Sequence, residues 1–146
     1  MKPRIDRAVP TEVGDPTTLF FKWTILDVII DKRRVDEMVL LSVEGIIKLG
    51  QSAEFLVQSL ERTLERDEGH VLLDLSKINY IDSTGIGELV AYLGRFAESG
   101  RHLVLVNPSE RIRKLLAISQ LEQLFTIYDD LDSALAGERS AVTGKT

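Results

Sequence analysis

The sequence lacks cysteine altogether, and its 146 residues include only two histidines. Without cysteine the chain forms no disulfide bond and no thiolate site for metal or redox chemistry, which suits a reducing compartment. No apolar stretch approaches the roughly 20 residues that span a bilayer, and residues 1–6 lack the apolar core of a secretory signal. We therefore expect a cytoplasmic protein with no membrane span.

Positive charge is also scarce in this chain. It has 18 lysine and arginine residues against 23 aspartate and glutamate residues, a net charge of −5. Because nucleic acids bind clustered basic surfaces, we expect no direct contact with nucleic acid. The content of 44% hydrophobic and 28% charged residues is typical of a globular domain, and the length suffices for one core.

The distribution of proline predicts the domain organisation. Three of the four prolines, Pro3, Pro10 and Pro16, lie near the N-terminus, where they disfavour helix. We predict an extended arm over residues 1–22, a folded domain over residues 23–137 and a polar tail over residues 138–146. The apolar end of the arm at residues 19–23 either packs on the domain edge or contacts a partner or a second copy.

Apolar runs and helical stripes alternate along the rest of the chain. The runs predict strands at residues 24–31, 38–47, 70–75, 103–106 and 125–128, with a charged turn at residues 31–34. The stripes predict four helices: one that ends at residue 66, one over residues 84–98, one that begins at residue 108 and a last one over residues 131–136. The order β-β-α-β-α-β-α-β-α favours an α/β domain with buried parallel strands.

The candidate site is the turn Asp-Ser-Thr-Gly-Ile-Gly at residues 82–87, between a buried strand and a helix. One interpretation is purely structural, because a polar residue at a helix start caps the helix and contributes about 1 kcal/mol. Glycines in such a turn allow a close backbone approach. On this interpretation we expect valine at Gly85 or Gly87 to damage the turn.

Enzymatic interpretations of the turn are less well supported. A nucleophilic serine needs a base, yet His70 and His102 start strands, at the end of the sheet opposite Ser83, where we expect them to be solvated. No Gly-Lys-Ser/Thr follows the glycines, which argues against a phosphate-binding loop. Asp74 and Asp82 do not require a metal, because turn chemistry accounts for Asp82. We predict no catalytic residue, metal or cofactor.

A third interpretation is that Ser83 is phosphorylated. A serine at the start of a helix is reachable by a kinase, and the helix N-terminus tolerates added negative charge. A phosphate adds a charge of about −1.5 to −2 at pH 7. A partner that buries this turn would then be released without unfolding of the domain.

The run from Leu73 to Gly87 resembles the signature of the STAS domain, most closely that of the bacterial anti-sigma factor antagonists. Residues 103–108, which lead into 112–116, and residues 124–128 extend the resemblance over residues 24–137. The resemblance implies a mixed sheet with helices mainly on one face, and Ser83 as the phosphate acceptor. It also implies an anti-sigma factor with serine kinase activity and a serine phosphatase as partners, and a protein that is not itself an enzyme.

The resemblance places the partner-binding face at Asp82, Ser83, Thr84, Gly85, Ile86, Gly87 and Lys48. Position 48 departs from the family pattern, because antagonists often carry aspartate where this chain has lysine. The reversed charge leaves the identity of the kinase open. A STAS subunit of a signalling scaffold or lipid-transport assembly, binding without phosphorylation, is the alternative, and a homodimer stays open as well.

Overall fold

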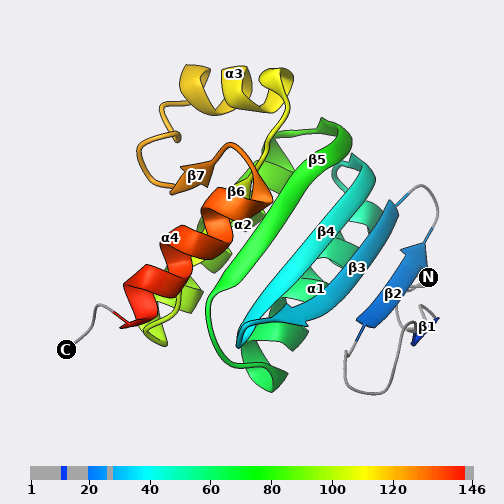
Figure 1. The fold of residues 1–146 in the computed structure, drawn as a ribbon. Coiled ribbons are helices and arrows are strands. Elements are labelled where there is room, and N and C mark those ends of the chain that lie inside the picture. Colours follow the sequence, from blue (N-terminus) through cyan, green and yellow to red (C-terminus); the bar gives the residue numbers. More distant parts are fainter. Residues whose placement is uncertain (1–10, 13–19, 26–27, 144–146) are drawn as a thin grey trace.

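Over the residues that the structure describes, one seven-stranded sheet and four helices make up the fold (Figure 1). The computed structural model describes residues 11–12, 20–25 and 28–143. The strands are β1 (Thr11–Glu12), β2 (Phe20–Ile25), β3 (Val28–Val35), β4 (Met38–Ile47), β5 (Val71–Ile81), β6 (Leu103–Val106) and β7 (Ile127–Tyr128). The helices are α1 (Gln51–Arg66), α2 (Ser83–Glu98), α3 (Glu110–Ile118) and α4 (Leu131–Thr143).

The strands lie in the sheet in the order of the chain. Strands β1 to β4 pair antiparallel, and β4 to β7 pair parallel. The mixed α/β fold and the predicted element order from β3 onward are confirmed, with β1 and β2 added before them. Because β4, β5 and β6 are parallel, the turns that follow them meet at one edge of the sheet, which we call the C-terminal edge.

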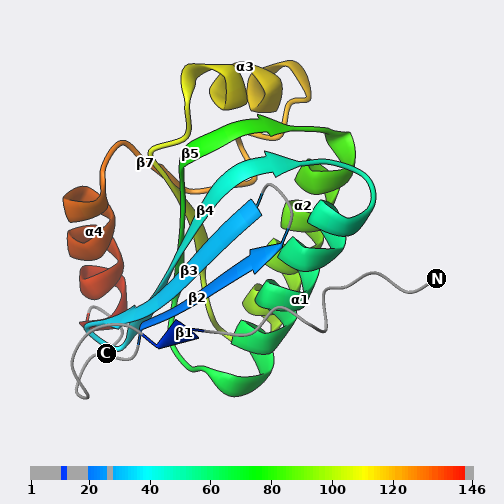
Figure 2. The ribbon, with the colours of Figure 1, turned by 90° about the vertical axis from the view of Figure 1, so that its right-hand side faces the viewer.

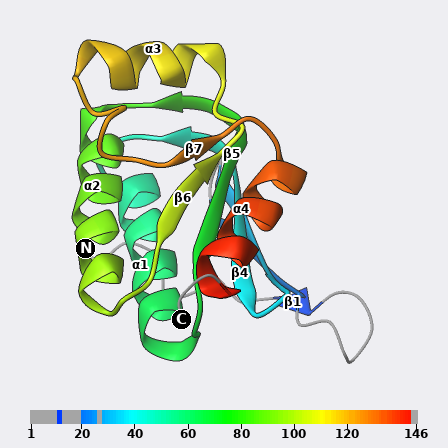
Figure 3. The ribbon, with the colours of Figure 1, turned by 60° about the vertical axis from the view of Figure 1, so that its left-hand side comes forward.

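Helices cover both faces of the sheet unequally. Helices α1 and α2 lie side by side on one face, as expected, and α4 lies on the other (Figure 2). Helix α3 lies across the C-terminal edge, above the end of β5 (Figure 3). The main core lies under α1 and α2, and its largest fully buried side chains include Phe55, Leu60, Leu73, Leu89 and Phe96. A smaller cluster around Leu72, Val104 and Ala134 lies under α4.

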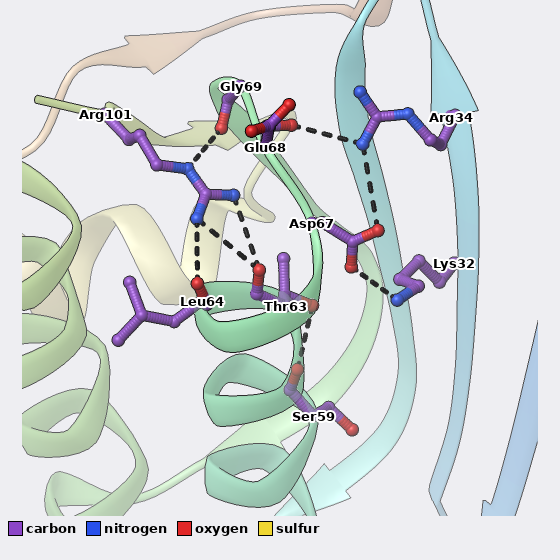
Figure 4. Close-up of polar contacts among 9 residues, drawn as sticks. All are labelled: Lys32, Arg34, Ser59, Thr63, Leu64, Asp67, Glu68, Gly69 and Arg101. Atoms are coloured by element: carbon purple, nitrogen blue, oxygen red, sulfur yellow. Dashed lines mark hydrogen bonds and ion pairs between the residues drawn. The ribbon is translucent and has the colours of Figure 1, made fainter. Parts of the chain in front are cut away.

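The charged run at residues 31–34 is not a turn, contrary to the prediction, but part of β3. The chain reverses instead at Asp36 and Glu37, which both have positive φ. Charges are tolerated in this strand because they find partners beyond the end of α1. Lys32 Nζ lies 2.5 Å from a carboxylate oxygen of Asp67, and the Arg34 side chain donates to the Glu68 carbonyl (Figure 4).

Strand β5 is longer than the apolar run that predicted it. The strand was predicted over residues 70–75, yet residues 76–80 continue it to Ile81. Parallel pairing with β4 persists along them through two register shifts, between Ser42 and Glu44 and between Gly45 and Ile46. The added length carries the site past the end of β6, which stops opposite Asp74, and level with the end of β4, because Ile81 pairs with Ile47.

The C-terminal part is also more regular than predicted. Helix α4 continues through Gly137 to Thr143, where a polar tail was expected. Gly137 does not end the helix; a Cβ there would lie 2.4 Å from the Tyr128 hydroxyl, so glycine allows the helix to approach that ring. At the other end, most of the predicted arm, residues 1–10 and 13–19, lies outside the described residues, and Phe20 to Lys22 belong to β2.

Arg101, just before β6, binds the end of α1 through hydrogen bonds (Figure 4). The Arg101 guanidinium donates to the carbonyls of Thr63, Leu64 and Gly69, and it lies over the Phe96 ring. Burial lowers the pKa of Arg101, against the attraction of nearby carboxylates. Within the described residues, no helix has the length and apolarity needed to cross a membrane.

Candidate functional site

Asp82 holds together the two turns that carry the predicted site. Its Oδ1 accepts a hydrogen bond from the Gly85 N–H at 3.0 Å and caps α2, so of the two caps that the sequence allowed, Asp82 and Ser83, the structure has Asp82. Its Oδ2 accepts from the Leu49 N–H at 2.9 Å, in the turn between β4 and α1. The Asp82 N–H in turn donates to the Ile47 carbonyl at 3.1 Å. The turns after β4 and β5 are therefore one connected unit.

The Asp82 carboxylate is ionised, and both of its oxygens accept hydrogen bonds. Burial alone would raise its pKa, but the backbone N–H groups of Gly85 and Leu49 outweigh burial and hold the pKa below its usual value. Both oxygens are engaged, so Asp82 is poorly suited to take a proton from the neighbouring Ser83. Among the described residues, no histidine lines the groove between β5 and α3 that adjoins Ser83.

The predicted site residues divide into exposed and buried positions. Ser83 and Gly87 are exposed, whereas Thr84 is half-buried. Gly85 and Ile86 are buried, and Ile86 is part of the main core. The buried pair supports the turn from below, and the exposed hydroxyl of Ser83 is what the turn presents to solvent.

Gly85 is required by close packing. A Cβ at this position would lie 2.7 Å from Ile81 Cγ1 and 2.8 Å from Ile47 Cγ2. Both isoleucines are buried at the ends of their strands, so neither can move away easily. At Gly87 a Cβ would meet nothing within 4 Å, so the structure gives no steric reason for the expected damage by valine there.

Lys48 lies at the C-terminal edge, as the sequence suggested, in the turn that Asp82 fastens. Its side chain is exposed, and its N–H donates to Ser52 Oγ at 2.9 Å. The next residue, Leu49, is 76% exposed despite its apolar side chain. This turn therefore adds a positive charge and an apolar side chain to the surface near Ser83.

A groove between the end of β5 and helix α3 adjoins Ser83, and sequence reasoning missed it. The groove has a volume of about 690 Å³. Tyr80 and Ser83 line one side, and Arg111, Lys114 and Ile118 line the other. Tyr80 is 46% exposed and Ile118 is 82% exposed. The only sequence signal was apolar side chains on a short helix, which resembles an ordinary core stripe.

The two histidines form a cluster with Glu138 at the opposite edge of the sheet, where His70 and Glu138 are buried and His102 is exposed. Their rings stack with centroids 4.1 Å apart. The expectation that both are solvated is wrong for His70, which is 5% exposed. His102 Nδ1 lies 2.8 Å from Glu138 Oε1, and Glu138 Oε2 accepts from the Tyr128 hydroxyl at 2.7 Å.

The cluster is poorly arranged to hold a metal, although the ligand atoms of His70, His102 and Glu138 lie within 4.8 Å of one another. His70 Nδ1 accepts the His102 N–H at 2.9 Å, so a neutral ring carries its proton on Nε2 and has no lone pair for a metal. Rings stacked 12° from parallel also cannot both point at one ion. The cluster instead fastens α4 to the start of β6.

Comparison with known proteins gives a consistent result. The sequence pattern of the STAS domain matches residues 29–134. The chain is 29% identical over 101 residues to a Thermotoga neapolitana protein that carries the provisional name of anti-sigma factor antagonist, covering 69% of this chain and 89% of that protein. It is 33% identical over 88 residues to an anti-sigma-B factor antagonist of Staphylococcus epidermidis, covering 57% of this chain and 82% of that protein.

Solved structures agree with the sequence comparison. The crystal structure of a provisionally named anti-sigma factor antagonist from Thermotoga maritima superposes with a TM-score of 0.65 at 27% identity, over 74% of this chain and 92% of that one. An anti-sigma factor antagonist from Mycobacterium paratuberculosis superposes with a TM-score of 0.70 at 22% identity, over 77% and 94% of the two chains, which shows a shared fold.

Proposed function

The chain belongs to the STAS domain family, and on that premise we propose that it is an anti-sigma factor antagonist switched by phosphorylation of Ser83. Unphosphorylated, it binds an anti-sigma factor that has serine kinase activity. Phosphorylated, it releases that factor, and a serine phosphatase restores binding. The observation that carries the proposal is the exposed Ser83 hydroxyl on a rigid turn beside an apolar groove.

The geometry of the turn supports a switch that acts on the surface rather than on the fold. Asp82 keeps its capping bonds whether or not Ser83 carries a phosphate, because neither bond involves the Ser83 hydroxyl. A partner that buries the turn would have to desolvate the added charge. Disrupting a buried polar contact costs about 2–5 kcal/mol, and each 1.4 kcal/mol is a factor of ten, so affinity would fall roughly thirtyfold to several thousandfold.

The partner-binding surface that we propose combines the predicted turn residues with the groove. Ser83, Gly87 and Lys48 supply its exposed positions around the turn, and Tyr80 and Ile118 supply apolar area. Exposed apolar area next to charged side chains is typical of a protein interaction site.

The test uses purified anti-sigma factors encoded in the source genome. Incubation with ATP and such a factor should add one phosphoryl group by intact mass, and Ser83→Ala should abolish the addition while keeping binding. Ser83→Asp should weaken binding at least thirtyfold in calorimetry. Ser133→Asp is the matched control, because Ser133 is also exposed and lies in the first turn of a helix.

A phosphorylation-independent STAS subunit is the second candidate, and Lys48 favours it, because its charge is opposite to the aspartate often found in antagonists. Under that alternative, Ser83→Asp and Ser133→Asp bind a partner equally well. Equal affinity of the two variants for every anti-sigma factor that binds the wild type would therefore reject the switch.

A further inference from the structure

We propose that helix α3 contains an internal reader of the phosphorylated serine: Arg111 and Lys114 pair with the phosphate on Ser83 across the groove. This inference rests on the proposed phosphorylation of Ser83 and adds the residues that respond to it. Ser83 and both cations line the same groove, from elements on opposite sides of it. Pairing would draw the two basic side chains across the groove and cover the apolar area that a partner needs.

The face that α3 turns to the groove follows from helical spacing. Arg111, Lys114, Leu115 and Ile118 are three or four residues apart, so they share one side of the helix. Ile112 and Leu116, on the adjoining side of the helix, are buried and anchor it to the main core, and Ile112 also lines the groove. The two long basic side chains are therefore held at their Cα atoms by a fixed helix and stay flexible at their tips.

The phosphate needs a counter-charge that the turn itself does not provide. The N–H groups of Gly85 and Leu49 that face this turn are already taken by the Asp82 carboxylate. That carboxylate lies next to Ser83 in the chain and repels a phosphate dianion. Lys48 is exposed in the turn after β4, and the cations that line the groove with Ser83 come from α3.

The charges that line the groove balance only before phosphorylation. Asp82 and Glu110 contribute two negative charges, and Arg111 and Lys114 contribute two positive charges. Lys114 Nζ lies 3.8 Å from Glu110 on an exposed surface, where such a pair contributes little stability. A phosphate dianion on Ser83 is the stronger attraction, and guanidinium and ammonium groups form charge-assisted hydrogen bonds with it.

The experiment measures the pKa of the phosphate itself. Phosphoserine is incorporated at position 83 biosynthetically, without any kinase, and the phosphate is titrated by ³¹P NMR. A phosphate monoester has its second pKa at about 6, and nearby cations lower it. Arg111→Gln and Lys114→Gln should each raise the phosphate pKa, by roughly half a unit or more.

The matched control is Arg113→Gln, on the same helix and with the same change in charge. Arg113 does not line the groove and instead pairs with Asp129 at 2.7 Å. Its replacement should leave the phosphate pKa unchanged. Equal values for the Arg111, Lys114 and Arg113 variants would overturn the proposal, as would a rise produced by Lys48→Gln alone.

The experiments distinguish a failure of the proposed pairing of Arg111 and Lys114 with the phosphate (the reader) from a failure of the proposed release of the partner (the switch). A lower affinity of phosphorylated protein for its partner, with no effect of Arg111→Gln or Lys114→Gln on the phosphate pKa, rejects the reader and keeps the switch. A pKa effect of those two variants supports the reader even where the partner does not respond to phosphorylation. In that second case the proposed switching of the anti-sigma factor is what fails.

Discussion

Replacing Gly85 by alanine is the sharpest test of how the site is built. The added methyl group would lie 2.7 Å from Ile81 Cγ1 and 2.8 Å from Ile47 Cγ2, well inside ordinary van der Waals contact. Ile47 is fully buried and Ile81 is 5% exposed, so relief requires that the start of α2 move away from β4 and β5. The Asp82 bonds that join the two turns would lengthen at the same time.

The magnitude follows from two opposing effects. Overpacking a close-packed core costs about 1–3 kcal/mol, whereas alanine is favoured over glycine within a helix by about 0.5–1 kcal/mol. We expect a net destabilisation of roughly 1–2 kcal/mol for Gly85→Ala. Gly87→Ala is the control, because it gains the same helix propensity without any contact within 4 Å; it should be stabilised by about 0.5–1 kcal/mol.

The assay is chemical denaturation of the two alanine variants beside the wild type. Their free energies of unfolding should differ by roughly 2 kcal/mol, and their melting temperatures by several degrees, in opposite directions from the wild type. Binding should follow the same order, because only Gly85→Ala displaces Ser83. Equal stability of the two variants would show that the ends of β4 and β5 do not pack against α2 as described.

Three further predictions concern side-chain hydrogen bonds that stabilise the fold. Arg101→Met should lower the free energy of unfolding by about 2–4 kcal/mol in urea denaturation, because it removes the guanidinium that donates to three carbonyls. Arg139→Met, at an exposed ion pair, should change it by less than about 1 kcal/mol. Burial and then a carboxylate partner raise the pKa of Tyr128 to about 12. Its stabilising effect is therefore complete below the unfolded pKa of about 10 and is lost as pH rises toward 12, so Tyr128→Phe should flatten the loss of stability over that window. The pKa of Asp82 is lowered, so its contribution is present above the ordinary pKa of aspartate and is lost as pH falls; Asp82→Asn should lose stability at pH 7 and little in acid.

Most of the architecture could be predicted because apolar runs and stripes dominate it. The strand at Met38–Ile47 was predicted at its observed bounds and the helix before β5 at its observed end, Arg66, and both are rich in buried side chains. The charged end of β3 was misjudged because the ion pair of Lys32 with Asp67 joins residues 35 apart in sequence. Local composition carries no sign of such a pairing.

The site was predicted in part, for a similar reason. The cap by Asp82 has a local signature, a polar residue before a helical stripe, and it was found. Its second bond, to the Leu49 N–H, depends on how β4 and β5 pair and has no local signature. The groove beside Ser83 forms only because α3 lies across the C-terminal edge, so no local sequence pattern predicts it.

The two edges of the sheet differ in how their polar groups are used, and this difference bears on the switch. At the edge that holds His70 and Arg101, side chains bind backbone carbonyls, each other and α4, so changes there alter stability. At the edge that holds Ser83, Asp82 and Ser52 accept hydrogen bonds from the backbone N–H groups of the two turns, and the side chains of Tyr80 and Ile118 are exposed to solvent. A phosphate on Ser83 would therefore act on exposed side chains, while the close-packed core beneath them stays in place. A reversible binding switch requires this combination.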